Sequence, residues 1–158
     1  MQSDVLLHRP PRMINGKKEI YDPVRRRYVA STPEETVRQA YLRYLTEILH
    51  FPPICLSVEK KVNYNGLIRR YDIVAYRPDA RALLLVECKA EHVALSDNTL
   101  YQAAMYNHEL QAAFVVLFNG RQQFVCQRQP DGYLEMPSLP EYADALSQTE
   151  TELTSKSQ

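Results

Sequence analysis

The run Leu83-Leu84-Leu85-Val86 is followed directly by two charged residues, Glu87 and Lys89, with Cys88 between them. Side chains alternate between the two faces of a strand, so a strand that is apolar at every position is buried on both faces. Such a strand belongs in the middle of a sheet covered by helices, which predicts an α/β fold. At its end Glu87 and Lys89 share one face, while Cys88 points the other way, into the core.

Charge at the end of a buried strand is unfavourable unless a partner or a metal ion compensates it. Asp72 lies fifteen residues before Glu87, and a hairpin between them can place the two carboxylates side by side on neighbouring strands. Two carboxylates with open positions suit Mg²⁺, with Mn²⁺ as a substitute, because these ions bind oxygen ligands and retain waters. Lys89 can then orient or help to deprotonate an attacking water. The alternative is an ion pair that merely caps the strand.

The segments on either side of this strand follow helical and strand patterns in turn. A helix over 33–50 is indicated by the capping box of Thr32 and Glu35, by Pro33 in the first turn and by apolar residues at helical spacing. We expect strands at 56–62, 67–76 and 82–89, a helix at 97–111, and strands at 113–118 and 122–127, with turns at Asn65-Gly66 and Asn119-Gly120. The predicted central mixed β-sheet therefore has the order helix, three strands, helix, two strands.

The two ends of the chain are expected to lie outside this core. Residues 1–30 form an N-terminal extension with a hairpin at 20–30, where Asp22-Pro23 supplies the turn. The domain itself spans 31–146 and ends in a short helix around Glu141 to Leu146. Residues 147–158 are rich in Ser, Thr, Gln and Glu, so we expect a disordered tail.

Composition narrows the classes of function. The net charge is zero, which at first weighs against DNA as a partner, but the first 72 residues carry an excess of five positive charges. The pairs Lys60-Lys61 and Arg69-Arg70 can line a DNA-binding cleft, although such short runs are also typical of solvated surface. Three widely spaced cysteines without a C-x-x-C pattern predict neither disulfides nor zinc. Without a long apolar stretch, we expect a cytoplasmic protein with no membrane partner.

Five motifs occur in order along the chain between Thr32 and about Tyr142. They are Thr32-Pro33-Glu34-Glu35-x-Val37-Arg38-Gln39, Arg70-x-Asp72-Ile73-Val74, Val86-Glu87-Cys88-Lys89-Ala90, Gln102-x-x-x-Tyr106-Asn107 and Asn119-Gly120. In these motifs the chain resembles the N-terminal nuclease domain of type I restriction-enzyme motor subunits. The resemblance implies a restriction-endonuclease-like PD-(D/E)xK core and Mg²⁺-dependent cleavage of DNA phosphodiesters by Asp72, Glu87 and Lys89. It also implies that Gln102 and Tyr106 contact DNA.

Two helical positions add to the predicted site. Gln102 and Tyr106 are four residues apart and lie on one face of their helix, although a buried Tyr106 hydroxyl bonded to Gln102 would explain the pair equally well. By helical phase Glu34 lies on the stripe that faces the sheet, whereas the capping box occupies Glu35, so Glu34 is predicted as a third metal ligand. The alternative is that both glutamates only complement the helix dipole.

The resemblance stops short of the motor. The phosphate-binding pattern G-x-x-x-x-G-K-[ST] is missing from the sequence, so we expect a stand-alone nuclease without ATP-driven translocation. How the cut is targeted is left open: a targeting protein such as a helicase or methyltransferase, a homodimer that grips both strands, or nicking of branched DNA. The competing hypothesis is an inactive DNA-binding or assembly module with the same fold, which zero net charge favours.

Overall fold

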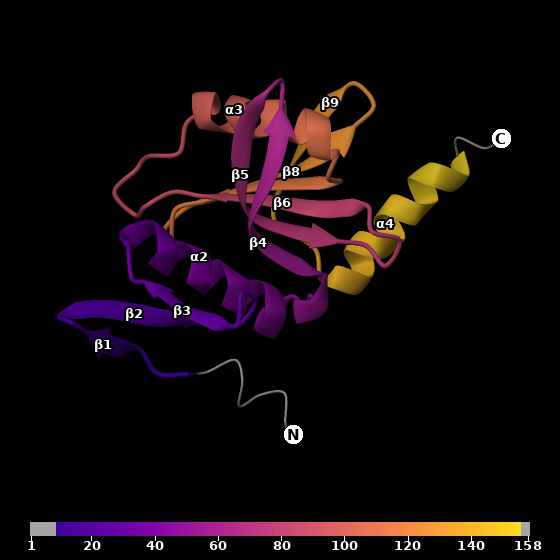
Figure 1. Cartoon of the computed structure of the whole chain (residues 1–158). Helices are drawn as coiled ribbons and strands as arrows, with labels where there is room; N and C mark the ends of the chain where they lie inside the picture. The colour runs from indigo at the N-terminus through magenta and orange to yellow at the C-terminus, as the bar shows by residue number, and fades with distance from the viewer. Residues whose placement is uncertain (1–8, 156–158) are drawn as a thin grey trace.

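Two β-sheets with a helix between them set the architecture of the chain (Figure 1). The computed structural model describes residues 9–155. The smaller sheet is antiparallel and comprises β1 (Arg12–Ile14), β2 (Lys17–Asp22) and β3 (Arg27–Ala30). After it comes α2 (Pro33–Arg43), which continues into the π-helical turn η1 (Tyr44–Ile48). The predicted hairpin at 20–30 and the predicted helix at 33–50 are therefore confirmed.

The larger sheet is mixed and has six strands in the order β4-β5-β6-β7-β8-β9. A short 3-10 turn, η2 (Pro53–Cys55), leads into it. Its strands are β4 (Leu56–Tyr64), β5 (Leu67–Tyr76), β6 (Ala82–Cys88), β7 (Phe114–Phe118), β8 (Gln123–Gln129) and β9 (Gly132–Met136). Strands β6 and β7 pair in parallel, and the other neighbours pair antiparallel.

Helices cover both faces of this larger sheet, as Figure 1 shows. On one face lies α2 and on the other α3 (Asp97–Leu110), while α4 (Tyr142–Ser155) lies beside one end of the sheet. The run from Leu83 to Val86 is fully buried. Within it Leu84 and Val86 belong to the core cluster of α2, whereas Leu85 belongs to a second cluster with Tyr106 of α3. The prediction of a central strand buried on both faces is confirmed.

Three elements differ from the sequence-based expectations. β1 and β9 were not predicted, because both strands are mostly exposed and lack the apolar alternation that marks a half-buried strand. β9 follows β8, so three strands come after α3 where two were expected. Helix α4 continues to Ser155 across much of the expected disordered tail, with Thr149 buried and hydrogen-bonded to Arg77. Residues 156–158 lie outside the described part of the chain.

No helix within residues 9–155 is both long and apolar enough to cross a membrane. The three cysteines are free, in line with the expectation that they form no disulfide.

Candidate functional site

Strands β5 and β6 bring Asp72 and Glu87 together. Their ladder ends at the pair Ile73–Val86, and the next residue on each strand is Asp72 or Glu87. Beyond this pair the Asp72 side chain takes the place of a backbone acceptor, because its Oδ2 accepts a hydrogen bond of 2.8 Å from the backbone N–H of Cys88. Asp72 is buried. The two carboxyl groups therefore lie side by side at the end of the central strand.

The surroundings of Glu87 disfavour its ionised form. Burial, the charge of Asp72 and a side-chain hydrogen bond with Asp72 raise the pKa of Glu87 from 4.5 to about 9. Lys89 acts in the opposite direction, as a nearby cation does. Within the described residues Glu87 Oε1 is buried and has no hydrogen-bond partner. Without a cation beside it, the ionised form of Glu87 is therefore disfavoured, and within the described residues Oε1 is open to a ligand.

This pair fits a divalent cation that takes oxygen ligands. The described residues contain no group of three or more His, Cys, Asp or Glu side chains that could hold a metal ion. Mg²⁺, however, is commonly held by one or two carboxylates together with waters and substrate phosphates. Asp72 and Glu87, with the unpartnered Oε1, are the residues that would hold it.

Arg38 of α2 is part of this site, although the sequence analysis assigned it no role. Its guanidinium donates from Nη2 to Asp72 Oδ1 at 2.6 Å and from Nη1 to Glu35 Oε2. Burial opposes its charge, but the hydrogen bond and charge of Asp72 raise the pKa of Arg38 above its ordinary value. The sequence did offer one sign of this role, because Arg38 follows Val37 on the part of the helix that packs on the sheet.

The two glutamates at the start of α2 are placed differently from the expectation. Glu35 is 6% exposed, whereas the side chain of Glu34 is 50% exposed and lies 3.6 Å from Arg38. Thr32 caps the helix by accepting from the Glu35 N–H at 3.1 Å, but the Glu35 carboxylate bonds to arginines, so the capping box is only half formed. Glu34 contributes to the raised pKa of Glu87. Its role as a metal ligand stays a prediction.

The residues predicted to contact DNA lie in two environments. Arg69 Nη1 donates to the Tyr106 hydroxyl at 2.5 Å, and its guanidinium lies 4.5 Å from the centre of that ring. The Tyr106 hydroxyl therefore contacts an arginine, while Gln102 is exposed on α3. Arg70 turns toward Glu59 of β4 at 3.7 Å. The structure thus joins Arg70 to the carboxylates near Arg38 and joins Arg69 to α3.

Replacing Glu87 with glutamine is expected to stabilise the metal-free protein above neutral pH. Because the folded-state pKa of Glu87, about 9, exceeds the ordinary 4.5, its contribution to stability is complete below pH 4.5 and is lost as the pH rises toward 9. Glutamine removes this loss, which for a desolvated group amounts to about 1–3 kcal/mol. Urea unfolding in EDTA at pH 5 and pH 8 measures it, with Glu141→Gln at an exposed position as the control. Equal stability of wild type and Glu87→Gln at pH 8 would contradict the burial of this charge.

Comparison with known proteins places these residues in a family. The family model for the type I restriction enzyme R protein N terminus matches residues 33–140. The match extends from the start of α2 through the six-stranded sheet and includes every candidate residue from Glu34 to Tyr106, but it leaves out the three-stranded N-terminal sheet. No curated protein is significantly similar to the sequence. Since the match covers more than half of the chain, this protein belongs to the family of type I restriction enzyme R protein N-terminal domains.

Proposed function

We propose that the chain is a divalent-cation-dependent DNA endonuclease with a PD-(D/E)xK core. The observation that carries this proposal is the pair of carboxyl groups, Asp72 and Glu87, at the end of a central strand, with a buried Glu87 oxygen that has no partner among the described residues. A scaffold without a ligand has little reason to keep a buried acid beside a half-buried one, because each disfavours the ionisation of the other. Membership of a restriction-enzyme family supports DNA as the substrate.

Three residues have separate roles in the proposed reaction. Asp72 is held in place by the Cys88 N–H and presents its carboxylate beside Glu87. When bound there, Mg²⁺ would supply positive charge that stabilises the phosphate in its pentacovalent transition state. Lys89 follows Glu87 by two residues, orients the attacking water and assists removal of its proton. As a ligand Glu87 would be in its carboxylate form, which a nearby cation favours.

The proposal is tested by incubating supercoiled plasmid with the protein and Mg²⁺ or Mn²⁺. We expect nicked and then linear DNA, complete inhibition by EDTA, and no cleavage by Asp72→Asn. That substitution keeps the shape of the side chain and removes a charge. Tight DNA binding without a divalent ion, together with intact plasmid, would instead support an inactive DNA-binding module.

DNA binding is expected to depend on Arg69 and Arg70. Phosphate contacts carry no base information, so replacing both arginines with alanine should weaken binding to all sequences alike. Each lost phosphate contact lowers the slope of log K against log salt by about 1. A mobility-shift series between low and moderate salt measures this slope. Double replacement of the exposed Arg43 and Arg128 is the matched control, and an equal change in slope there would assign the effect to overall charge.

A further inference from the structure

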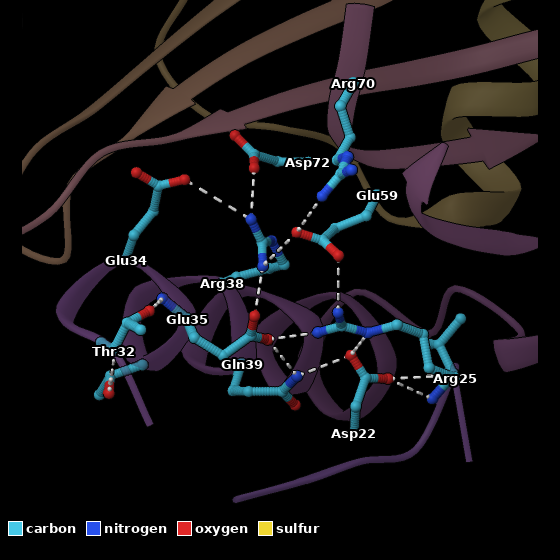
Figure 2. A network of polar contacts seen from close by, with 12 residues as sticks. Asp22, Arg25, Thr32, Glu34, Glu35, Arg38, Gln39, Glu59, Arg70 and Asp72 are labelled. Atoms are coloured by element: carbon cyan, nitrogen blue, oxygen red, sulfur yellow. Dashed lines mark hydrogen bonds and ion pairs between the residues drawn. The ribbon is translucent and has the colours of Figure 1, made fainter. Parts of the chain in front are cut away.

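A chain of alternating charges connects the N-terminal sheet to Asp72, as Figure 2 shows. Arg25 donates to Asp22 at 2.7 Å and to Glu35 at 2.6 Å. Glu35 then accepts from Arg38, which in turn bonds to Asp72 at 2.6 Å. All five side chains are 12% exposed or less. Ion pairs this well shielded from water are weakly screened, so removing a charge at one end changes the interaction energies at the other end.

Arg25 joins three separate elements through one guanidinium group. Its Nε bonds to Asp22 of β2, its Nη2 to Glu35 of α2 and its Nη1 to Glu59 of β4 at 3.0 Å. Asp22 also closes the turn that carries Arg25, because its Oδ1 accepts from the backbone N–H groups of Val24 and Arg25 at 2.8 Å. Arg25 is therefore fixed by its own turn and can hold the other two elements.

Glu59 adopts an unusual backbone conformation at this junction. Its φ is 52°, in the left-handed region that non-glycine residues rarely occupy. The β4–β5 ladder is interrupted there, with pairs Val58–Ile73 and Lys60–Tyr71 on either side of Glu59 and Asp72. The Glu59 carboxylate meets Arg25 and lies 3.7 Å from Arg38. The irregular backbone is thus accompanied by a carboxylate shared between two arginines of the charge chain.

We infer that Arg25 is a positioning residue of the candidate site, which acts through Glu35 to hold the Arg38 guanidinium against Asp72. Glu35 divides its oxygens, with Oε1 accepting from Arg25 and Gln39 and Oε2 accepting from Arg38. Without Arg25, Oε1 gains capacity for Arg38 and draws it away from Asp72. The N-terminal sheet, outside the family match, is then part of the site.

The shape of the surface agrees with this assignment. A cleft of about 590 Å³ lies between the N-terminal sheet and α2. The residues that line it include Arg25 and Val29, Glu34, Glu35 and Arg38 of α2, and Glu59 of β4. Arg25 and Arg38, the latter bonded to Asp72, therefore line the same cleft.

A double-mutant cycle in the metal-free protein tests the connection without requiring any activity. Within the described residues no hydrogen bond or ion pair joins Arg25 directly to Asp72, so any coupling between them passes through Glu35 or Glu59 and then through Arg38. We expect Arg25→Met and Asp72→Asn to couple by at least about threefold in the unfolding equilibrium constant, the range found for shared networks. The control is Arg26→Met, which removes the same charge from the same turn at an exposed position.

Additive effects of Arg25→Met and Asp72→Asn, equal to those of the Arg26 cycle, overturn the inference. If Arg25→Met does not fold, the cycle is run with Arg25→Lys. Lysine keeps the charge but lacks the planar fork that reaches three carboxylates. The interaction between position 25 and Asp72 should therefore be clearly weaker with lysine than with arginine, so Arg25→Lys and Asp72→Asn should still be non-additive.

A kinetic measurement, which rests on the proposed nuclease function, separates an effect of Arg25 on the position of the site residues from an effect of its charge on DNA binding. We expect Arg25→Met to lower kcat by at least about tenfold with little change in KM, since misplacement far from the reacting atoms is known to have such effects. Arg26→Met should leave kcat unchanged. Unchanged kcat in Arg25→Met, when wild type cleaves, overturns the inference. If wild type does not cleave, the nuclease proposal fails and the double-mutant cycle alone decides the role of Arg25.

Discussion

Replacing Lys89 with alanine is expected to lower plasmid cleavage by about 10²–10⁴-fold, the usual contribution of general acid or base help. The side chain lies on the same strand end as Glu87 and close enough to lower the pKa of that carboxyl group. In the proposed reaction Lys89 acts on water and on the transition state without being a metal ligand, so Mn²⁺ binding should persist. Single-turnover cleavage and calorimetric Mn²⁺ titration measure the two properties separately.

The matched control for this prediction is Lys17→Ala. Lys17 is an exposed lysine on β2, outside the family match, so its loss removes the same charge without touching the carboxylates. Loss of Mn²⁺ binding together with activity in Lys89→Ala would indicate a structural ion pair with Glu87. Full cleavage by Lys89→Ala would remove this lysine from the mechanism.

The central strand and its neighbours could be predicted because their signals are local. Four apolar residues in a row require burial on both faces, and the charged residues that follow mark the strand end. The alternation of side chains then places Glu87 and Lys89 on one face, and the hairpin length brings Asp72 opposite Glu87. These steps depend on the period of a strand and on one tight connection, both of which can be read from the sequence.

The charge network around Asp72 could not be predicted in the same way. Arg38 and Asp72 are 34 residues apart, and their contact depends on how α2 crosses the sheet. The helical phase assigned to the first turn of α2 was also wrong, because Glu35 shares the buried face with Arg38 and Leu42, whereas Glu34 is half exposed. A buried charge is stable only where its partners meet in space, and sequence spacing does not specify that meeting.

Replacing Arg38 with methionine is expected to give the largest loss of stability in the site. The substitution removes the cation that pairs with Asp72 and Glu35, both of which are buried, and leaves their charges without full compensation. Breaking a buried ion pair by removing one partner lowers the free energy of unfolding by about 3–5 kcal/mol. Urea unfolding in EDTA at pH 7 measures this loss. Arg43→Met, an exposed arginine in the last turn of the same helix, should change stability by less than about 1 kcal/mol.

The cause of that loss can be separated from simple loss of packing. If uncompensated charge is responsible, Asp72→Asn combined with Arg38→Met should unfold with a smaller loss than the sum of the two single changes, because the second substitution removes a charge that the first left unpaired. Methionine retains most of the apolar stem of arginine, so burial of the side chain changes little. Additive losses would mean that Arg38 stabilises the protein by packing between α2 and β5. The ion pair between Arg38 and Asp72 would then contribute nothing to the stability of the metal-free protein.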